Sequence, residues 1–184
     1  MNTVSTQTYP RTIDDGAGSR MTFLRRTADA LEVTSTVAPG EGPPMHVHHL
    51  QEEAVAVREG RVGYTIEGEQ ERFAGVGERV SFAPGVAHTF RNAGEGDLVL
   101  DGTVSPPLNF EWFLTRVYES TAAAGGQRPR TFDAAYLMTR YRSEFTMSEI
   151  PAPVRRGLFP VLAAAGRLFG LGRRFAGAPE PVAR

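Results

Sequence analysis

The chain has 184 residues and a formal net charge of −1, which allows one domain with a real core and gives no whole-chain case for nucleic-acid binding. All 20 basic residues are arginine, so chemistry that needs a lysine side chain, such as Schiff-base formation, is excluded. There is no cysteine, which excludes disulfides, thiolate nucleophiles and cysteine-ligated zinc or iron–sulfur sites.

Neither a secretory signal nor a membrane span is expected. The N-terminal stretch MNTVSTQTYPRTIDD lacks a basic segment followed by an apolar one. The longest apolar stretch, residues 157–172, is interrupted by Pro160 and Arg167 and is shorter than the ~20 residues that a spanning helix needs. The sequence therefore predicts a cytoplasmic protein.

Short alternating runs rich in Val, Phe, Thr and Ile follow one another from about Ser19 to Ser105, and turns rich in glycine and proline separate them. This spacing predicts an all-β antiparallel sandwich or barrel rather than βαβ units. The later runs 110–120 and 131–145 have helical periodicity, and a further helix is expected to begin near Pro160.

These patterns divide the chain into three expected segments. Residues 1–18 form an N-terminal arm, residues 19–107 form the β-barrel, and residues 108–184 form a C-terminal helical extension.

The end of the extension has the pattern of a basic amphipathic helix. On a helical wheel Arg156, Arg167 and Arg174 nearly coincide. Apolar residues gather on the opposite side: Leu158, Val161, Leu162, Ala165, Leu168 and Phe169. Such a helix can attach to anionic lipid or dock to an acidic partner. We favour the alternative that its apolar face packs on the barrel or on a second subunit, because its glycines weaken an isolated helix.

Three of the four histidines lie in the stretch PPMHVHHLQEE, residues 43–53. If this stretch contains a strand, His46 and His48 share one face and His49 points to the other, which predicts a surface or supporting role for His49. In the next run Glu53 leads the bulky uncharged face that should point inward, whereas Glu52 lies on the side facing water. Glu53 is therefore the expected carboxylate ligand.

The fourth histidine follows a Pro-Gly turn in the segment GERVSFAPGVAHTFRN. His88, Phe90 and Asn92 share one face of this strand. If it pairs near the first two histidines, His88 completes a set of three imidazoles and one carboxylate. Asn92 is expected to satisfy backbone groups, and Tyr64 is expected to be a core residue rather than a proton donor at the site.

The first of two motifs that resemble those of the cupin family is a glycine, five residues, His-x-His, three or four residues, Glu, six residues and Gly. In this sequence its positions are Gly40, His46, His48, Glu53 and Gly60. The second motif is a glycine, five residues, Pro-x-Gly, two residues, His, three residues and Asn. Its positions are Gly77, Ala83, Gly85, His88 and Asn92, with alanine where the motif has proline.

The resemblance, to small bacterial single-domain cupins of the quercetin-dioxygenase type, covers about residues 20–105. It implies a double-stranded β-helix, or jelly-roll barrel, that carries the short helical extension outside the family motifs. It also implies one divalent transition metal per chain, bound by His46, His48, Glu53 and His88. Iron, manganese, nickel, zinc, cobalt and copper all suit such a ligand set.

The resemblance implies dioxygen activation, isomerisation or decarboxylation of small oxygenated compounds, or oxidation of small acids, and we favour a metal-dependent, dioxygenase-like oxidoreductase. The apolar inward residues Val55, Val57 and Phe90 favour a substrate with an aromatic or apolar body. Two alternatives stay open. One is a metal or small-ligand binding module without turnover, such as a sensor or assembly component; the other is a metal-dependent isomerase or decarboxylase. No residue is assigned a catalytic role beyond the metal ligands, and no organic cofactor is indicated. We expect a homodimer with a small-molecule partner, no nucleic-acid partner and no membrane contact.

Overall fold

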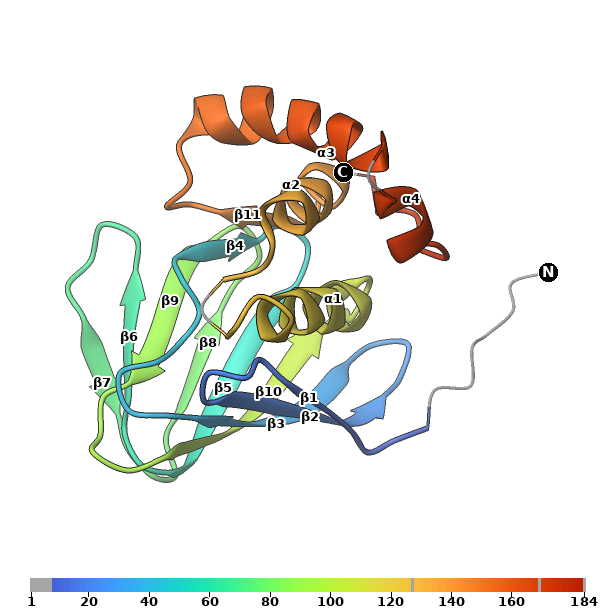
Figure 1. Cartoon of the computed structure of the whole chain (residues 1–184). Coiled ribbons are helices and arrows are strands. Elements are labelled where there is room, and N and C mark those ends of the chain that lie inside the picture. The colour runs from blue at the N-terminus through green and yellow to red at the C-terminus, as the bar shows by residue number, and fades with distance from the viewer. Residues whose placement is uncertain (1–7, 127, 169, 184) are drawn as a thin grey trace.

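Two antiparallel sheets form the framework of the described chain, which in this computed structural model comprises residues 8–126, 128–168 and 170–183. Figure 1 shows the strands in the lower part of the view and the helices above them. The first sheet contains, in spatial order, β1 (Arg11–Asp14), β2 (Ser19–Arg26), β3 (Leu31–Val37), β10 (Leu98–Ser105), β5 (Glu52–Glu59) and β8 (Arg79–Phe82). The second contains β11 (Phe145–Met147), β4 (His46–His48), β9 (Ala87–Asn92), β6 (Val62–Ile66) and β7 (Arg72–Ala74).

From β4 onward the chain crosses repeatedly between the two sheets. Strand β4 lies in the second sheet and β5 in the first; β6 and β7 return to the second, and β8, β9 and β10 continue the alternation. Two facing antiparallel sheets linked in this way form a double-stranded β-helix, or jelly roll. The predicted all-β fold class with a short C-terminal helical extension is confirmed.

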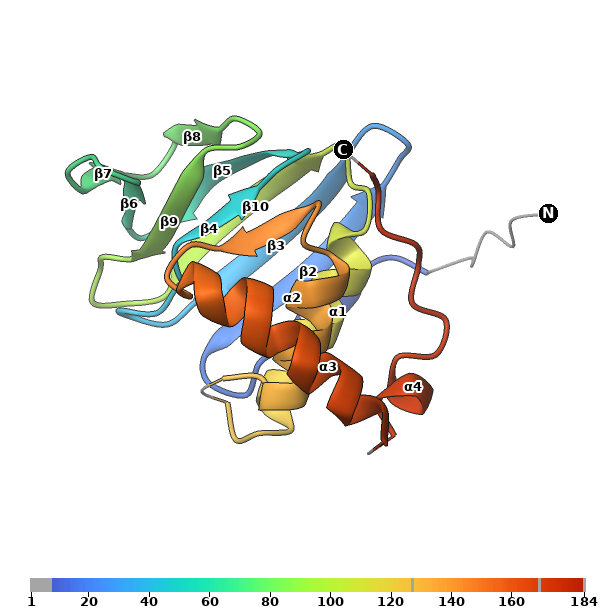
Figure 2. The same cartoon turned by 90° about the horizontal axis from the view of Figure 1, so that it is seen from above.

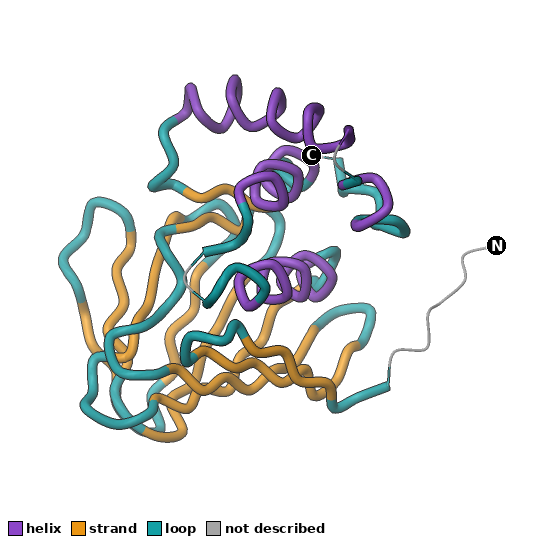
Figure 3. The backbone as a smooth tube through the Cα atoms, in the orientation of Figure 1, coloured by secondary structure: helices purple, strands orange, loops and turns teal. Residues whose placement is uncertain are grey.

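The helices that follow β10 gather on one side of the sheets (Figures 1 and 3). Their bounds are α1 (Phe110–Ala122), α2 (Thr131–Arg140), the π-helix η1 (Val154–Leu158), α3 (Phe159–Leu168) and α4 (Leu171–Arg174). Helix α2 ends before the predicted residue 145 because residues 141–144 turn the chain into β11, which pairs with β4. The helical periodicity therefore continues for one turn beyond the helix itself.

The sheets extend beyond residues 19–107 at both ends. Strand β1 lies in the expected arm and pairs with β2, and β11 lies in the expected extension and pairs with β4. Residues 1–7 of the arm lie outside the described residues. The boundaries of the three segments stay predictions, and the pairing shows that strands from all three share the sheets.

Two apolar clusters fill the interior. One lies between the sheets and includes Val55, Val57, Phe82 and Phe90. The other joins barrel strands to the helices, and its buried members are Ile13, Phe23, Leu31, Val33, Val104, Phe110, Phe113, Leu137, Tyr141, Phe145, Leu171 and Phe175. Because this second cluster draws on both parts of the chain, the helices are packed into the barrel's own core rather than attached to its surface.

Helix α3 packs mainly against α2, and Figure 2 shows it lying over that helix. The contact buries Ala163 and Gly166, and any side chain at position 166 would collide with Leu171. Three members of the predicted apolar face, Leu158, Val161 and Leu168, are instead exposed, so these side chains do not pack on the barrel as expected. Phe169, another member, lies outside the described residues. No helix in the described ranges is long and apolar enough to cross a membrane.

Candidate metal centre

Strand pairing brings three histidines to one place. Strand β4 presents His46 and His48 on the same side because residues two apart in a strand share a face. The antiparallel register of β4 with β9 sets His46 directly opposite His88. The ring centroids of His46 lie 5.0 Å from those of His48 and 4.5 Å from those of His88. The condition on which the predicted set depended, that the two strands pair, is therefore met.

Glu53 reaches the histidines from the facing sheet, where it begins the inward side of β5. Its Oε2 atom lies 3.5 Å from Nε2 of His46, 3.3 Å from Nε2 of His48 and 3.0 Å from Nε2 of His88. One ligand atom from each of the four residues lies within 4.8 Å of all the others. Glu53 is buried while Glu52 is exposed, which confirms the predicted assignment of the two glutamates to opposite faces.

The outer ring nitrogens decide the tautomers of two of these histidines. Nδ1 of His46 lies 2.8 Å from the carbonyl oxygen of Pro44, and Nδ1 of His88 lies 2.9 Å from that of Val86. A carbonyl only accepts, so in each case Nδ1–H donates and the neutral ring keeps a lone pair on Nε2. Both lone pairs face the Glu53 carboxylate, and this second-sphere arrangement is the one that metal-bound histidines use. His48 differs, because its Nδ1 is buried without a hydrogen-bond partner among the described residues.

Burial and charge prepare the four groups for a cation. Burial opposes ionisation of Glu53, but the neighbouring imidazoles, His48 foremost, outweigh it and hold the pKa of this carboxyl well below its usual range. Burial also lowers the pKa of His48, against the pull of Glu53. The buried carboxylate of Glu53 and the Nε2 lone pairs of His46 and His88 therefore form an electron-rich centre that a cation between them would stabilise.

Aromatic rings wall the centre. Phe82 stacks on His88 with ring centroids 3.9 Å apart and planes 5° apart. Phe110 and Phe145, both from the extension, lie 5.5 Å and 5.4 Å from the ring of His48. The sequence analysis did not place these two residues at the site, because nothing in their local pattern distinguishes them from other core residues of the extension.

The remaining residues discussed from the sequence fall as predicted. His49 points away from the centre, and its Nε2 lies 2.7 Å from the hydroxyl of Thr146. The amide nitrogen of Asn92 donates to the carbonyls of Val37 and Gly96, so it satisfies backbone groups. Tyr64 packs against the apolar cluster between the sheets.

The sequence analysis also missed Gln51, two residues before Glu53. It is fully buried, and neither polar atom of its amide has a partner among the described residues. A buried amide without partners costs free energy, so the Gln51 amide needs a polar partner.

The Cupin domain family matches residues 33–104, a range that holds all four clustered residues and strands β3 to β10. Residues 33–104 therefore form a cupin domain. Its second sheet gains β11 from outside the matched range, so the cupin domain here is completed by the extension.

Solved structures of other cupins are similar to this chain. KdgF from Halomonas sp. is 21% identical, with 51% of this chain and 85% of that chain covered at a TM-score of 0.47. An RmlC-like cupin from Shewanella frigidimarina is 20% identical, with 58% and 92% covered and a TM-score of 0.47. A sugar phosphate isomerase of the cupin superfamily from Silicibacter pomeroyi is 20% identical, with 48% and 59% covered and a TM-score of 0.43. No curated protein matches the chain.

The donor set of the cupin domain fits a divalent transition metal and could hold one. Three imidazole nitrogens and one carboxylate oxygen, without thiolate, form a borderline-hard site that several first-row metals accept. The distances of 3.0–3.5 Å between the three Nε2 atoms and Oε2 of Glu53 suit donors that each bind one common ion at ~2.0–2.2 Å.

Proposed function

We propose that the cupin domain binds one divalent transition metal through His46, His48, Glu53 and His88 and acts as a dioxygenase-like oxidoreductase on a small oxygenated molecule. The observation that carries this proposal is the meeting of three Nε2 atoms on the buried Oε2 of Glu53. Two of these rings are held in the metal-binding tautomer by backbone carbonyls. The Nε2 lone pairs of His46 and His88 and the Glu53 carboxylate all accept, and a shared cation would satisfy them.

A bound metal supplies Lewis acidity and coordination positions for dioxygen or for an oxygen of the substrate. The chain's own residues supply the surroundings. Phe82, Phe110 and Phe145 exclude water and favour a substrate with an apolar or aromatic body. The unpaired amide of Gln51 is suited to a hydroxyl or carbonyl oxygen of such a substrate.

A second function, metal or ligand binding without turnover, is favoured by the burial of the centre. His48, Glu53 and His88 are 3%, 8% and 1% exposed, and the extension covers the side of His48. A centre closed in this way suits a tightly held, coordinatively saturated metal. The two functions differ in whether the metal keeps an exchangeable water.

Metal analysis of the protein purified without added metal or chelator tests the proposal. We expect one equivalent of iron, manganese or nickel per chain, with an exchangeable water visible by water-proton relaxation. Oxygen consumption with a panel of enols, catechols and flavonoids then tests turnover. A saturated metal without oxygen consumption supports the binding module, turnover of the same panel without oxygen uptake supports an isomerase or decarboxylase, and a metal-free protein from metal-rich medium contradicts both proposals.

We also propose that the protein is a homodimer whose subunits meet through α3. The support is the apolar stripe of Leu158, Val161 and Leu168, whose side chains are 50%, 64% and 86% exposed. Leu158 ends η1 and the other two belong to α3, and exposed apolar side chains gathered in one patch are typical of interaction surfaces.

The paired change Val161→Glu and Leu168→Glu is expected to convert the dimer to a monomer, because two carboxylates cannot be buried in an apolar interface. Light scattering after size exclusion measures the mass. Val76→Glu, at a side chain 67% exposed on another part of the surface, is the matched control and should leave the dimer intact. A wild-type mass of one subunit at high concentration would contradict the proposal.

A further inference from the structure

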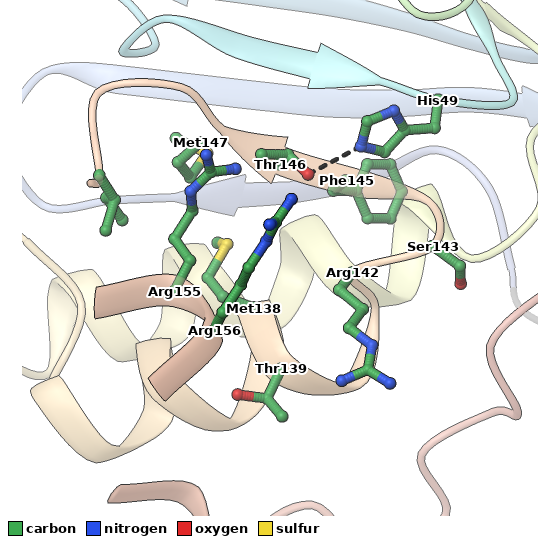
Figure 4. A pocket seen from close by; sticks show the side chains of 11 residues that line it. His49, Met138, Thr139, Arg142, Ser143, Phe145, Thr146, Met147, Arg155 and Arg156 are labelled. Atoms are coloured by element: carbon green, nitrogen blue, oxygen red, sulfur yellow. Dashed lines mark hydrogen bonds between the residues drawn. The ribbon is translucent and has the colours of Figure 1, made fainter. Parts of the chain in front are cut away.

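A second pocket lies outside the barrel, between β11, the end of α2 and the π-helix η1 (Figure 4). Its volume is about 500 Å³, within the ~300–1,000 Å³ that small-molecule sites occupy. None of the four clustered metal-site residues lines it. The pocket therefore needs an explanation of its own.

The charge of this outer pocket is wholly positive. Arg142, Arg155 and Arg156 line it, and no aspartate or glutamate does. Within the described ranges no carboxylate pairs with any of the three, whereas other surface arginines such as Arg72 and Arg91 each hold a glutamate. Three uncompensated guanidinium groups around one pocket create a strong local preference for an anion.

The acids that are nearest in sequence are engaged elsewhere. The Glu144 carboxylate is fully buried and accepts hydrogen bonds from Asn109 and from the backbone of Val182. The Glu149 carboxylate accepts from the backbone of Met45. Neither neutralises the arginines, so their charge is available to a ligand.

Polar groups of the pocket are also left without partners. Nε of Arg155 and Oγ1 of Thr139 are buried and have no hydrogen bond within the described part of the chain. Figure 4 shows Arg155 and Arg156 reaching from η1 toward β11, where His49 and Thr146 form a hydrogen-bonded polar wall. Guanidinium forks in this position match the paired oxygens of a carboxylate or phosphate.

The rest of the lining is apolar, with Met138, Met147 and Ile150 among its residues. A free inorganic ion would leave these side chains uncovered, so an anion with an apolar body fits better. We propose that the outer pocket is a binding site for a small organic anion, a carboxylate or phosphate monoester with an apolar body, held by Arg155 and Arg156, with the charge of Arg142 elsewhere in the lining, and separate from the metal centre.

The two sites are neighbours at β11, and Phe145 and Met147 line the outer pocket as well as Thr146. In the pairing of β11 with β4, Phe145 is opposite His48 and Met147 is opposite His46, while Thr146 between them is opposite Val47. Thr146 therefore lies on the face away from the histidines, because neighbouring strand residues point to opposite sides. Occupation of the outer pocket does not require the metal.

Calorimetric titration of the full-length protein, as purified, tests the site with phenyl phosphate and with benzoate. Benzyl alcohol is the neutral control and inorganic phosphate tests the need for an apolar body. We expect both aromatic anions to bind, benzyl alcohol not to bind, and inorganic phosphate to bind more weakly than phenyl phosphate. The aromatic anion that binds with the higher affinity shows whether phosphate or carboxylate is the preferred head group.

Variants locate the binding. Arg155→Gln and Arg156→Gln should each weaken the preferred anion about 10-fold or more, since each removes a charge-assisted hydrogen bond. Arg142→Gln provides the same test if a change in η1 disturbs folding. Arg167→Gln, at an exposed α3 arginine outside the pocket, should leave the affinity unchanged, and so should Glu53→Gln in the metal centre.

Three outcomes would overturn the proposal. The first is no binding of either aromatic anion at millimolar concentration, even if the protein binds phosphatidylglycerol vesicles. The second is an equal loss in Arg167→Gln, which indicates unspecific attraction to the basic tail. The third is a loss in Glu53→Gln, which indicates that the anion binds at the metal.

Discussion

Glu53→Gln is expected to abolish metal binding while Glu52→Gln keeps it. Glutamine preserves the size of the side chain but removes the negative charge that three imidazoles surround at 3.0–3.5 Å. Changes in groups that only support metal ligands cost about 10–100-fold in affinity, so loss of a ligand's charge should cost more than about 100-fold. Metal content by mass spectrometry and affinity by chelator competition measure the effect.

The two glutamates form a matched pair, because they are adjacent in sequence and on opposite faces of β5. His48→Ala should lose metal as fully as Glu53→Gln, and activity should disappear with the metal in both variants. An equal loss of metal in Glu52→Gln and Glu53→Gln would show that the face assignment is wrong. Retention of one equivalent of metal in Glu53→Gln and in His48→Ala would show that the metal binds elsewhere.

Phe145→Ala is expected to destabilise the protein by about 3–5 kcal/mol, the usual cost of deleting a buried aromatic ring. Phe145 is 5% exposed, and its ring stacks 4.4 Å from that of Phe113 and lies 5.4 Å from that of His48. The change also removes the wall beside His48, so metal affinity should fall although no ligand is altered. Urea unfolding of the metal-free protein isolates the packing effect, and chelator competition measures the second.

Phe73→Ala is the control for this prediction, because the Phe73 ring is 45% exposed and its described partner is the guanidinium of Arg61. Its cost should stay within about 1 kcal/mol, the value of an exposed cation–π contact. A loss in Phe145→Ala no larger than that in Phe73→Ala would mean that the extension does not share the barrel's core. Unchanged metal affinity would mean that its ring does not support His48.

Alternation along short strands predicts from the sequence alone which side chains of the candidate centre share the inward face. His46 and His48 are two residues apart, and Glu53 heads a run whose apolar members mark the inward face. Burial of Glu53 and exposure of Glu52 follow from that period alone. Metal binding itself, the homodimer and the cytoplasmic location stay predictions.

The extension was predicted less well, because one of its strands is very short and the packing of its helices depends on distant segments. Strand β11 has three residues, too few for an alternating pattern to stand out from the helical run before it. The packing face of α3 depends on α2, whose surface accepts the small residues Ala163 and Gly166 and leaves the larger leucines outside. No helical wheel contains that information.

The sequence by itself determined the four residues that cluster, the strand faces that they occupy and the class of fold, because each follows from residue types repeated at short, regular spacing. Only the tertiary structure decided that Phe110 and Phe145 lie beside His48, and that three arginines without a carboxylate partner among the described residues line one pocket beside β11. Contacts between segments about a hundred residues apart depend on how whole elements pack, and local periodicity carries no record of them.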